Sequence, residues 1–318
     1  MTTTLDLPIV LRRVRHGEHG RLLLLHGLAN SATVWQNFTD HDTGCATWAA
    51  DLPWRGEGVA GWSHRGDLTD WIAQAVNALA TPAPDPVADH FASPTPHLID
   101  TAPGQSPPAP GASPHENNAI EQAFGVANEY STGVKSPGRG DLVVVAHSFS
   151  ANLLLSLLDR TPELGVGGIV LVSPFYRAEP EGFEWADIAR YLNDFHLIME
   201  DGIRAQGGQR LSPGVRRELA LRVRDLVGPY GWTRFFQTYL ATPWLRLDRV
   251  TTPVLVLSGE NDFAALPAEA RALAAALPNA RARVLPDCGH FLMAERPERF
   301  AAEITRFVHS LPVGETTR

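Results

Sequence analysis

The feature that most constrains the fold of this chain is an apolar strand that runs directly into a serine between small residues. The segment VVVAHSFSAN spans residues 143–152, its first serine is Ser148, and a helical pattern continues to Asp159. A chain that turns from strand to helix within one residue needs strained backbone at the turn and small neighbours around it. The pattern therefore predicts a buried strand, a serine at its carboxyl end, and a helix whose amino end points at the serine hydroxyl.

This layout is known as a nucleophile elbow, whose usual pattern is Gly-x-Ser-x-Gly. Here Ala146 and Ser150 take the places of the two glycines, so the small size is kept but glycine is not. In an elbow, the N–H of Phe149 at the start of the helix can stabilise a negatively charged oxygen. The segment by itself also fits an ordinary strand-to-helix turn. The rest of the chain is needed to distinguish this turn from a nucleophile elbow.

The order of apolar and helical patterns along the chain predicts the fold class. We expect strands at residues 9–15, 21–25, 46–50, 143–146, 168–174, 253–258 and 281–285, and helices at residues 67–79, 149–159, 267–277 and 297–311. Strands that alternate with helices in this way form a parallel sheet that is covered on both faces. The prediction is an α/β fold with a mostly parallel central sheet.

Two long segments interrupt this alternation. Residues 81–140 are rich in proline and poor in large apolar groups, so we expect a partly disordered insertion with a short helix near 114–130. This insertion could act as a lid or bind a carrier protein or another protein. Residues 175–248 are helical in pattern and rich in aromatics, which predicts a helical cap. The α/β core would then consist of residues 1–80, 141–174 and 249–311, followed by a flexible tail at 312–318.

Two further polar residues follow predicted strands and could work with the serine. Ser148, Asp262 and His290 occur in this order, each after a different strand, so one crevice at the carboxyl ends of the strands can hold all three. Because a serine hydroxyl is a poor nucleophile, it needs a base, and the base needs an acid that orients it. We interpret His290 as the base and Asp262 as the acid. Glu260 is the second choice for the acid, and Asp287 is too close to His290 in sequence.

A second backbone donor is expected after the strand at 21–25. Gly27 follows this strand directly, and a glycine there allows a tight turn that leaves backbone N–H groups pointing outward. The N–H of Leu28 would face Ser148 and form an oxyanion hole together with the N–H of Phe149. For the side chain of His26 we favour a structural role.

Charge and composition exclude several other classes of function. The net charge is -8 and no basic run occurs, so nucleic acid is not expected as a partner. Cys45 and Cys288 are the only cysteines, and Cys288 is interpreted as a packing residue. Because the histidines are scattered, we expect no metal and no cofactor. Neither a secretory signal nor a membrane-spanning run is visible, which predicts a cytoplasmic protein.

Taken together, these motifs resemble those of the α/β-hydrolase superfamily over nearly the whole chain except residues 81–140. The resemblance rests on the turn at 26–28, the loop at 51–58, Ser148 in its elbow, Asp262 after its strand and His290 after a glycine. It implies an α/β-hydrolase fold with a helical cap placed after the strand that follows the elbow. It also implies a serine nucleophile, whereas dehalogenases and epoxide hydrolases of this superfamily carry an aspartate at the elbow.

The predicted activity is hydrolysis of a carboxylic ester or thioester of a small to medium apolar substrate. Two alternatives remain open. The same triad could hydrolyse a C–C bond or transfer an acyl group in a biosynthetic or cyclising reaction, and the frame could also serve as a non-catalytic ligand receptor.

Overall fold

The computed structural model describes residues 9–55, 62, 66–80, 141–207 and 210–312. The insertion predicted at 81–140, with its short helix near 114–130, lies outside the described residues. The same holds for residues 313–318 of the predicted tail and for residues 56–58 of the loop that follows the third strand.

The described residues contain a seven-stranded sheet with the strand order β1-β3-β2-β4-β5-β6-β7. The strands are β1 (Val10–Arg15), β2 (Arg21–Leu25), β3 (Ala46–Asp51), β4 (Leu142–His147), β5 (Gly168–Val172), β6 (Val254–Gly259) and β7 (Ala280–Leu285). Strand β1 pairs with β3 in the antiparallel direction at the edge, and every other pair is parallel. The predicted α/β fold with a mostly parallel sheet is confirmed.

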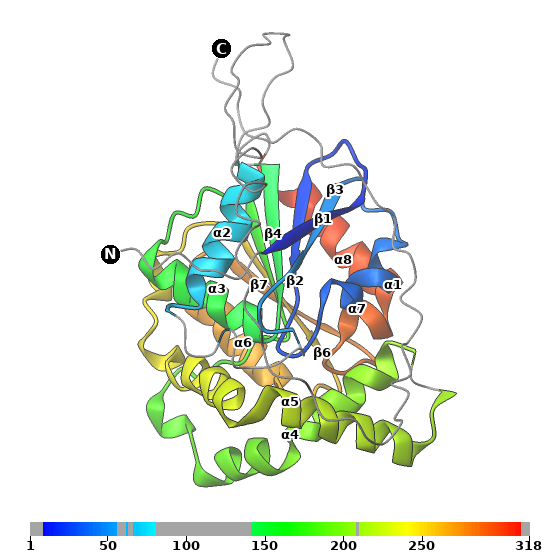
Figure 1. Cartoon of the computed structure of the whole chain (residues 1–318). Coiled ribbons are helices and arrows are strands. Elements are labelled where there is room, and N and C mark those ends of the chain that lie inside the picture. Colours follow the sequence, from blue (N-terminus) through cyan, green and yellow to red (C-terminus); the bar gives the residue numbers. More distant parts are fainter. Residues whose placement is uncertain (1–8, 56–61, 63–65, 81–140, 208–209, 313–318) are drawn as a thin grey trace, which may run out of the picture. The chain divides into compact units, whose positions relative to one another are not determined.

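Helices cover the two faces of this sheet, with α2, α3 and α6 on one face and α1 and α8 on the other (Figure 1). The α-helices are α1 (Gln36–Thr39), α2 (Thr69–Ala80), α3 (Phe149–Arg160), α4 (Trp185–Ala205), α5 (Pro213–Leu240), α6 (Pro267–Ala276), α7 (Leu292–Glu295) and α8 (Pro297–Ser310). Short 3-10 helices lie at Ala32–Trp35, Pro180–Gly182, Thr242–Trp244 and Leu247–Arg249. The sequence did not predict α1 and α7, because a single helical turn is too short to show a 3.6-residue period.

Coverage on both faces explains the composition of the central strands. Residues 22–25 of β2 are four leucines, and β4 and β5 are rich in valine; these strands are buried along almost their whole length. Near-continuous apolar runs of this kind are typical of parallel strands. Because parallel strands end at the same edge, the loops after β4, β6 and β7 meet there.

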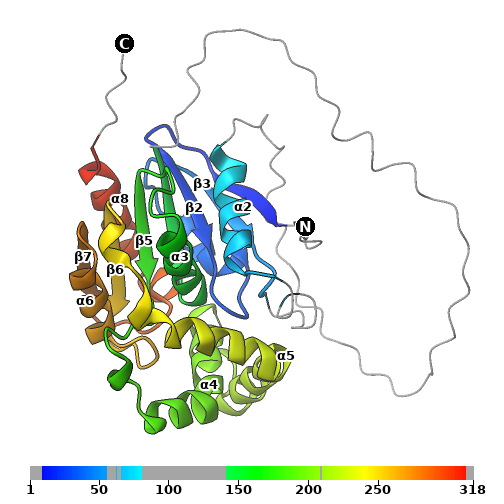
Figure 2. The same ribbon diagram turned by 90° about the vertical axis from the view of Figure 1, so that its left-hand side faces the viewer.

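The segment between β5 and β6 contains the two longest described helices, α4 and α5. They lie together beyond the carboxyl ends of the parallel strands in both views (Figures 1 and 2). Helix α5 is kinked at Gly228, which has a φ of 62° and is followed by Pro229. The aromatic residues of this segment range from buried to largely exposed. Tyr191, Phe195, Phe235 and Tyr239 are buried, while Trp185 and Trp244 are 83% and 67% exposed.

Candidate active site

Ser148 occupies a strained turn between β4 and α3. Its backbone has φ 55° and ψ -119°, a left-handed conformation that residues other than glycine rarely adopt. Its N–H donates to the carbonyl oxygen of Val172 at the end of β5 over 2.8 Å, which holds the turn in register with the sheet. The side chain is buried apart from a residual exposure of 8%. This is the geometry that the sequence pattern of an elbow predicts.

The two departures from the glycine pattern are accommodated by packing and hydrogen bonding. Ala146 is fully buried within β4. The hydroxyl of Ser150 donates to the carbonyl oxygen of His26, and the indole Nε1–H of Trp54 donates to Ser150 Oγ over 3.1 Å. The serine in place of the second glycine therefore ties the start of α3 to the end of β2. The side chain that replaces the glycine hydrogen gains a specific role in the turn.

The turn after β2 approaches the elbow closely. A Cβ atom on Gly27 would lie 2.9 Å from Nδ1 of His147 and 3.0 Å from Cβ of Ser148, so only glycine fits without a shift. Within the described part of the chain, no backbone carbonyl oxygen accepts the N–H of Leu28. The N–H of Phe149 opens helix α3 and therefore has no acceptor in its own helix. Both predicted oxyanion donors thus belong to segments that border Ser148 and keep their hydrogens available.

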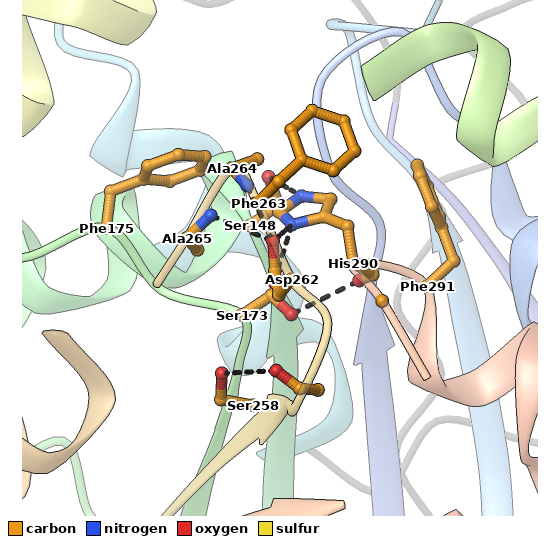
Figure 3. A network of polar contacts seen from close by, with 12 residues as sticks. Ser148, Ser173, Phe175, Ser258, Asp262, Phe263, Ala264, Ala265, His290 and Phe291 are labelled. Carbon is orange, nitrogen blue, oxygen red and sulfur yellow. Dashed lines mark hydrogen bonds and ion pairs between the residues drawn. The ribbon is translucent and has the colours of Figure 1, made fainter. Parts of the chain in front are cut away.

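Ser148, His290 and Asp262 form a continuous hydrogen-bonded array (Figure 3). The distance between Ser148 Oγ and His290 Nε2 is 3.0 Å, and the distance between His290 Nδ1 and Asp262 Oδ2 is also 3.0 Å. Asp262 is 2% exposed and His290 is 1% exposed. A carboxylate on Nδ1 favours the tautomer that carries its proton there, and this tautomer presents the Nε2 lone pair to the serine hydroxyl.

Asp262 is oriented by the backbone that follows it. Its Oδ1 accepts the N–H groups of Ala264 and Ala265 over 3.0 Å and 2.9 Å. The alternative acids of the sequence interpretation lie elsewhere. Glu260 and Asp287 are exposed, and Glu260 Oε2 accepts the N–H of Asp287 over 3.3 Å. Asp262 is therefore the acid that meets His290.

The loop that carries His290 is fixed by two residues that the sequence interpretation did not select. The carbonyl oxygen of His290 accepts the Nε2–H of His147 over 3.0 Å and the hydroxyl of Ser173 over 3.2 Å. Burial lowers the pKa of His147 well below its usual value, so its imidazole stays neutral and donates from Nε2. His147 lies within the elbow motif and Ser173 directly follows β5. Neither position in the sequence indicates that the side chain binds the carbonyl oxygen of His290.

Two side chains have the structural roles that the sequence suggested. Burial lowers the pKa of His26 to about 4, and the neutral ring accepts the N–H of Leu52 at Nε2 over 2.9 Å. Its other nitrogen donates to the carbonyl oxygen of Gly27 over 2.8 Å. Burial also raises the pKa of the Cys288 thiol to about 12, which removes the thiolate that a cysteine nucleophile needs.

Aromatic rings surround the array. The ring centre of Phe175 lies 5.8 Å from that of His290 and 4.8 Å from that of Phe235 on helix α5. The Asn152 side chain holds Phe175 through both backbone groups, at 2.8 Å and 3.1 Å. Phe235 also lies 6.4 Å from Phe149, the residue after the serine. Helix α5 therefore brings apolar surface up to the residues that flank the serine and the histidine.

A second buried carboxylate, Glu269 on α6, was not singled out in the sequence. It accepts the N–H of Tyr176 over 2.9 Å and the hydroxyl of Tyr239 over 2.7 Å, and a guanidinium nitrogen of Arg177 lies 3.5 Å away. Burial raises the pKa of Glu269 to about 7, while these donors act in the opposite direction. This cluster joins α6 to the segment between β5 and β6.

Across the described ranges, no three His, Cys, Asp or Glu side chains come together as metal ligands would. No helix in the described part of the chain combines the length and the apolar character that crossing a membrane requires.

Comparison with models of known protein families shows the family of the chain. Residues 22–303 match the model of the alpha/beta hydrolase family. Since the match covers most of the chain, the protein belongs to this family of hydrolase enzymes. No curated protein matches the sequence.

Solved structures with the same fold include several named enzymes. Est816, described as an N-acyl homoserine lactone degrading enzyme, is 18% identical with a TM-score of 0.56, over 94% of this chain and 96% of that one. MenH from S. aureus is 15% identical with a TM-score of 0.54, over 95% and 97% of the two chains. A thermophilic esterase from Thermogutta terrifontis is 18% identical with a TM-score of 0.52, over 95% and 93%. At these identities the similarity establishes the shared fold.

Proposed function

We propose that this protein is a serine hydrolase that cleaves a carboxylic ester or thioester of a small to medium apolar substrate. The observation that carries the proposal is the array in which Ser148 Oγ lies 3.0 Å from His290 Nε2 and His290 Nδ1 lies 3.0 Å from Asp262 Oδ2. A neutral serine hydroxyl becomes a useful nucleophile only when a base accepts its proton, and the array supplies a base and an acid that orients it.

In the first half of the proposed reaction, Ser148 Oγ attacks the carbonyl carbon of the substrate, and its proton passes to Nε2 of His290. Asp262 stabilises the imidazolium that forms. The negative charge on the former carbonyl oxygen is stabilised by the N–H groups of Leu28 and Phe149. The bond to the leaving oxygen or sulfur then breaks, the leaving group takes the proton from His290, and the acyl group remains on Ser148.

In the second half, a water molecule gives a proton to His290 and attacks the acyl carbon. The same two backbone groups stabilise the second tetrahedral intermediate. The bond to Ser148 Oγ breaks, the proton returns from His290 to that oxygen, and the carboxylic acid leaves. No group beyond the described side chains, the substrate and water is needed to balance these steps.

The apolar character of the substrate is inferred from the rings near the serine. Phe149 and Phe175 flank Ser148 and His290, and Phe235 of α5 packs against both rings. Pockets for apolar ligands are lined mainly by such residues, with a few polar groups that fix the orientation. Because Est816 is described as degrading an N-acyl lactone, which is a cyclic ester, an acyl lactone is included among the compounds to test.

The experiment is labelling with an alkyl fluorophosphonate, followed by intact mass spectrometry of the wild type and of Ser148→Ala. Esters, thioesters and lactones of graded acyl length would be assayed in parallel with both proteins. We expect one adduct on the wild type, none on the variant, and hydrolysis that depends on Ser148. A wild type that forms no adduct and hydrolyses none of these compounds would contradict the proposal and direct attention to ligand binding.

A further inference from the structure

The loop after β6 holds the Asp262 carboxylate through two consecutive peptide units. The first unit joins Phe263 to Ala264, and the second joins Ala264 to Ala265. Each unit donates its N–H to Oδ1 of Asp262, over 3.0 Å and 2.9 Å (Figure 3). Since each unit is planar, its N–H direction is set by the position of its carbonyl group. The orientation of Asp262 therefore depends on what holds those two carbonyl groups.

Helix α4 holds both of them with neighbouring residues. Arg190 Nη1 donates to the carbonyl oxygen of Phe263 over 2.9 Å. The hydroxyl of Tyr191 donates to the carbonyl oxygen of Ala264 over 2.7 Å. Each peptide unit thus accepts a hydrogen bond from α4 at one end and donates one to Asp262 at the other. Two parallel chains of hydrogen bonds lead from α4 to the same carboxylate oxygen.

We propose that Arg190 and Tyr191 are positioning residues, which orient Asp262 through the peptide units of residues 263–265 and strengthen the two hydrogen bonds that it accepts. This inference rests on the proposed function, since it assigns a role within the proposed Ser148, His290 and Asp262 triad. It places part of the support for the triad on a helix outside the sheet.

Polarisation supplies the physical reason. A donor on a peptide carbonyl draws electron density toward the oxygen, so the N–H at the other end becomes a stronger donor. A charged donor such as the guanidinium of Arg190 has the larger effect per bond. Tyr191 is 3% exposed, and burial raises its pKa well above the usual value, so the hydroxyl keeps the proton that it donates.

The Arg190 side chain is itself held in place. Its guanidinium lies 4.6 Å from the ring centre of Tyr191, and its Nη2 lies 3.4 Å from a carboxylate oxygen of Asp187 one turn earlier on α4. Cation–π and ion-pair contacts of this kind restrict a long side chain that would otherwise sample many rotamers. The donor to Phe263 is therefore directed by α4 and not by the loop.

The same helix also contacts the loops that carry the other proposed site residues. A Cβ atom on Gly202 would lie 2.7 Å from the ring of Phe291, the residue after His290. Nε2 of Gln206, the residue directly after α4, lies 3.2 Å from the side-chain oxygen of Asn30, and the Asn30 amide donates to the carbonyl oxygen of Leu28 over 3.1 Å. A shift of α4 would thus reach three loops of the site.

The chain offers a matched control. Tyr239 on α5 is also buried, and its hydroxyl also makes a 2.7 Å hydrogen bond, but its acceptor is Glu269. Tyr191→Phe and Tyr239→Phe each remove one buried hydroxyl from the same segment. A general loss of packing should affect both variants in the same way, whereas the proposed role predicts a loss in Tyr191→Phe alone.

The experiment is the kinetics of inactivation by an alkyl fluorophosphonate, which separates binding of the reagent from reaction. In the reaction step Ser148 Oγ forms a bond to phosphorus, fluoride leaves, and the serine proton passes to His290. We expect the limiting rate to fall about five- to tenfold in Tyr191→Phe and about threefold in Arg190→Met. The concentration that gives half the limiting rate should stay unchanged, and Tyr239→Phe should react within about twofold of the wild type.

The outcomes separate the two proposals. No adduct on the wild type would overturn the proposed function, and the positioning role with it. An adduct that forms at the same limiting rate in the wild type and Tyr191→Phe would overturn the positioning role alone. Equal slowing in Tyr191→Phe and Tyr239→Phe would also overturn it. If Tyr191→Phe does not fold, the limiting rate of Arg190→Met is the test, and a rate equal to that of the wild type would overturn the positioning role. The Arg190 side chain is partly exposed, so it can be replaced without opening the core.

Discussion

Two buried carboxylates of this protein invite comparison, because both follow the same strand and only one meets a base. Asp262, in the loop after β6, accepts two backbone N–H groups and faces His290, which in turn reaches Ser148. Glu269, in the first turn of α6, accepts one backbone N–H and one phenol and lies near one guanidinium. Each carboxylate is 2% exposed.

Under the proposed function, the difference means that burial and a shifted pKa do not by themselves define a catalytic site. Burial raises the pKa of Glu269 to about 7, a value that is often taken to mark an acid or base catalyst. Yet, among the residues that the structure describes, the partners of Glu269 are all donors, and none is a nucleophile or a base. Asp262 also only accepts hydrogen bonds, but one of its donors is the imidazole of His290, whose other nitrogen reaches Ser148 Oγ. The identity of this partner therefore distinguishes the two sites.

The largest effect on the Asp262 side is expected from Ser148→Ala. Removal of the proposed nucleophile should lower kcat on the best ester on the order of a million-fold, because the acyl-enzyme can no longer form. Steady-state hydrolysis measures this, and thermal unfolding of the variant checks that it is folded. A variant that retained a tenth of the wild-type kcat would rule out Ser148 as nucleophile.

Asp262→Asn should have the next largest effect. An amide cannot stabilise the imidazolium and can present an N–H to His290, which favours the wrong tautomer, so we expect kcat to fall about ten-thousandfold. The matched change in the second cluster is Glu269→Gln, which should leave kcat within about threefold of the wild type, since a structural contact in this position does not touch the reacting atoms. Losses of similar size in the two variants would contradict a purely structural role for Glu269.

Gly27→Ala should have an intermediate effect. The added Cβ would lie 3.0 Å from Cβ of Ser148, so the turn that carries Leu28 has to move away from the elbow. We expect kcat to fall roughly a hundred- to a thousandfold, the loss that follows removal of one oxyanion donor. Gly214→Ala is the control, because a Cβ there meets no atom within 4 Å and the position lies at the start of α5. If both variants kept wild-type kcat, Leu28 would not be an oxyanion donor.

The smallest effect concerns stability and distinguishes Glu269 by its pH dependence. The folded pKa of Glu269 is about 7 and the ordinary value is 4.5, so its proton is bound more tightly in the folded state. The stabilisation that the protonated Glu269 gives to the folded state is therefore fully present below about pH 4.5 and is lost as the pH rises through about 7. A pKa change from 4.5 to about 7 corresponds to a loss on the order of 3 kcal/mol.

Urea unfolding of the wild type and of Glu269→Gln between pH 4.5 and pH 8 measures this contribution. Because all other groups titrate in both proteins, the difference in unfolding free energy isolates Glu269. We expect the variant to gain stability relative to the wild type as the pH rises. A difference that stays constant over this range would mean that Glu269 remains ionised throughout.

The sequence was sufficient for the parts of the site that local patterns encode. Ser148, Asp262 and His290 each follow an apolar strand and a short turn, and parallel strands bring such turns to one edge of the sheet. The strained backbone of Ser148 also follows from the strand-to-helix pattern. The position is recognisable without the elbow glycines because Ala146 and Ser150 are also small. The structure accommodates the larger side chain of Ser150 through hydrogen bonds to other segments.

The residues that support the site could not be predicted, because their partners come from distant segments. Glu269 lies in the first turn of a helix, where an acidic residue is expected to face solvent and the helix dipole. Its burial depends on Tyr176 and Tyr239, which are 93 and 30 residues away in sequence. Likewise, the helical period of α4 shows that Tyr191 can be buried but not that it contacts Ala264.

The proposed role of Ser148 as nucleophile is best tested by identifying the acyl-enzyme. The wild type would be mixed with a p-nitrophenyl ester, quenched in acid within milliseconds to seconds, digested, and mapped by tandem mass spectrometry. We expect the acyl mass to be attached to the peptide that contains Ser148, and Ser148→Ala to carry none. Turnover of the ester with no acyl group on Ser148 at any time, or an equal adduct on Ser148→Ala, would contradict this role.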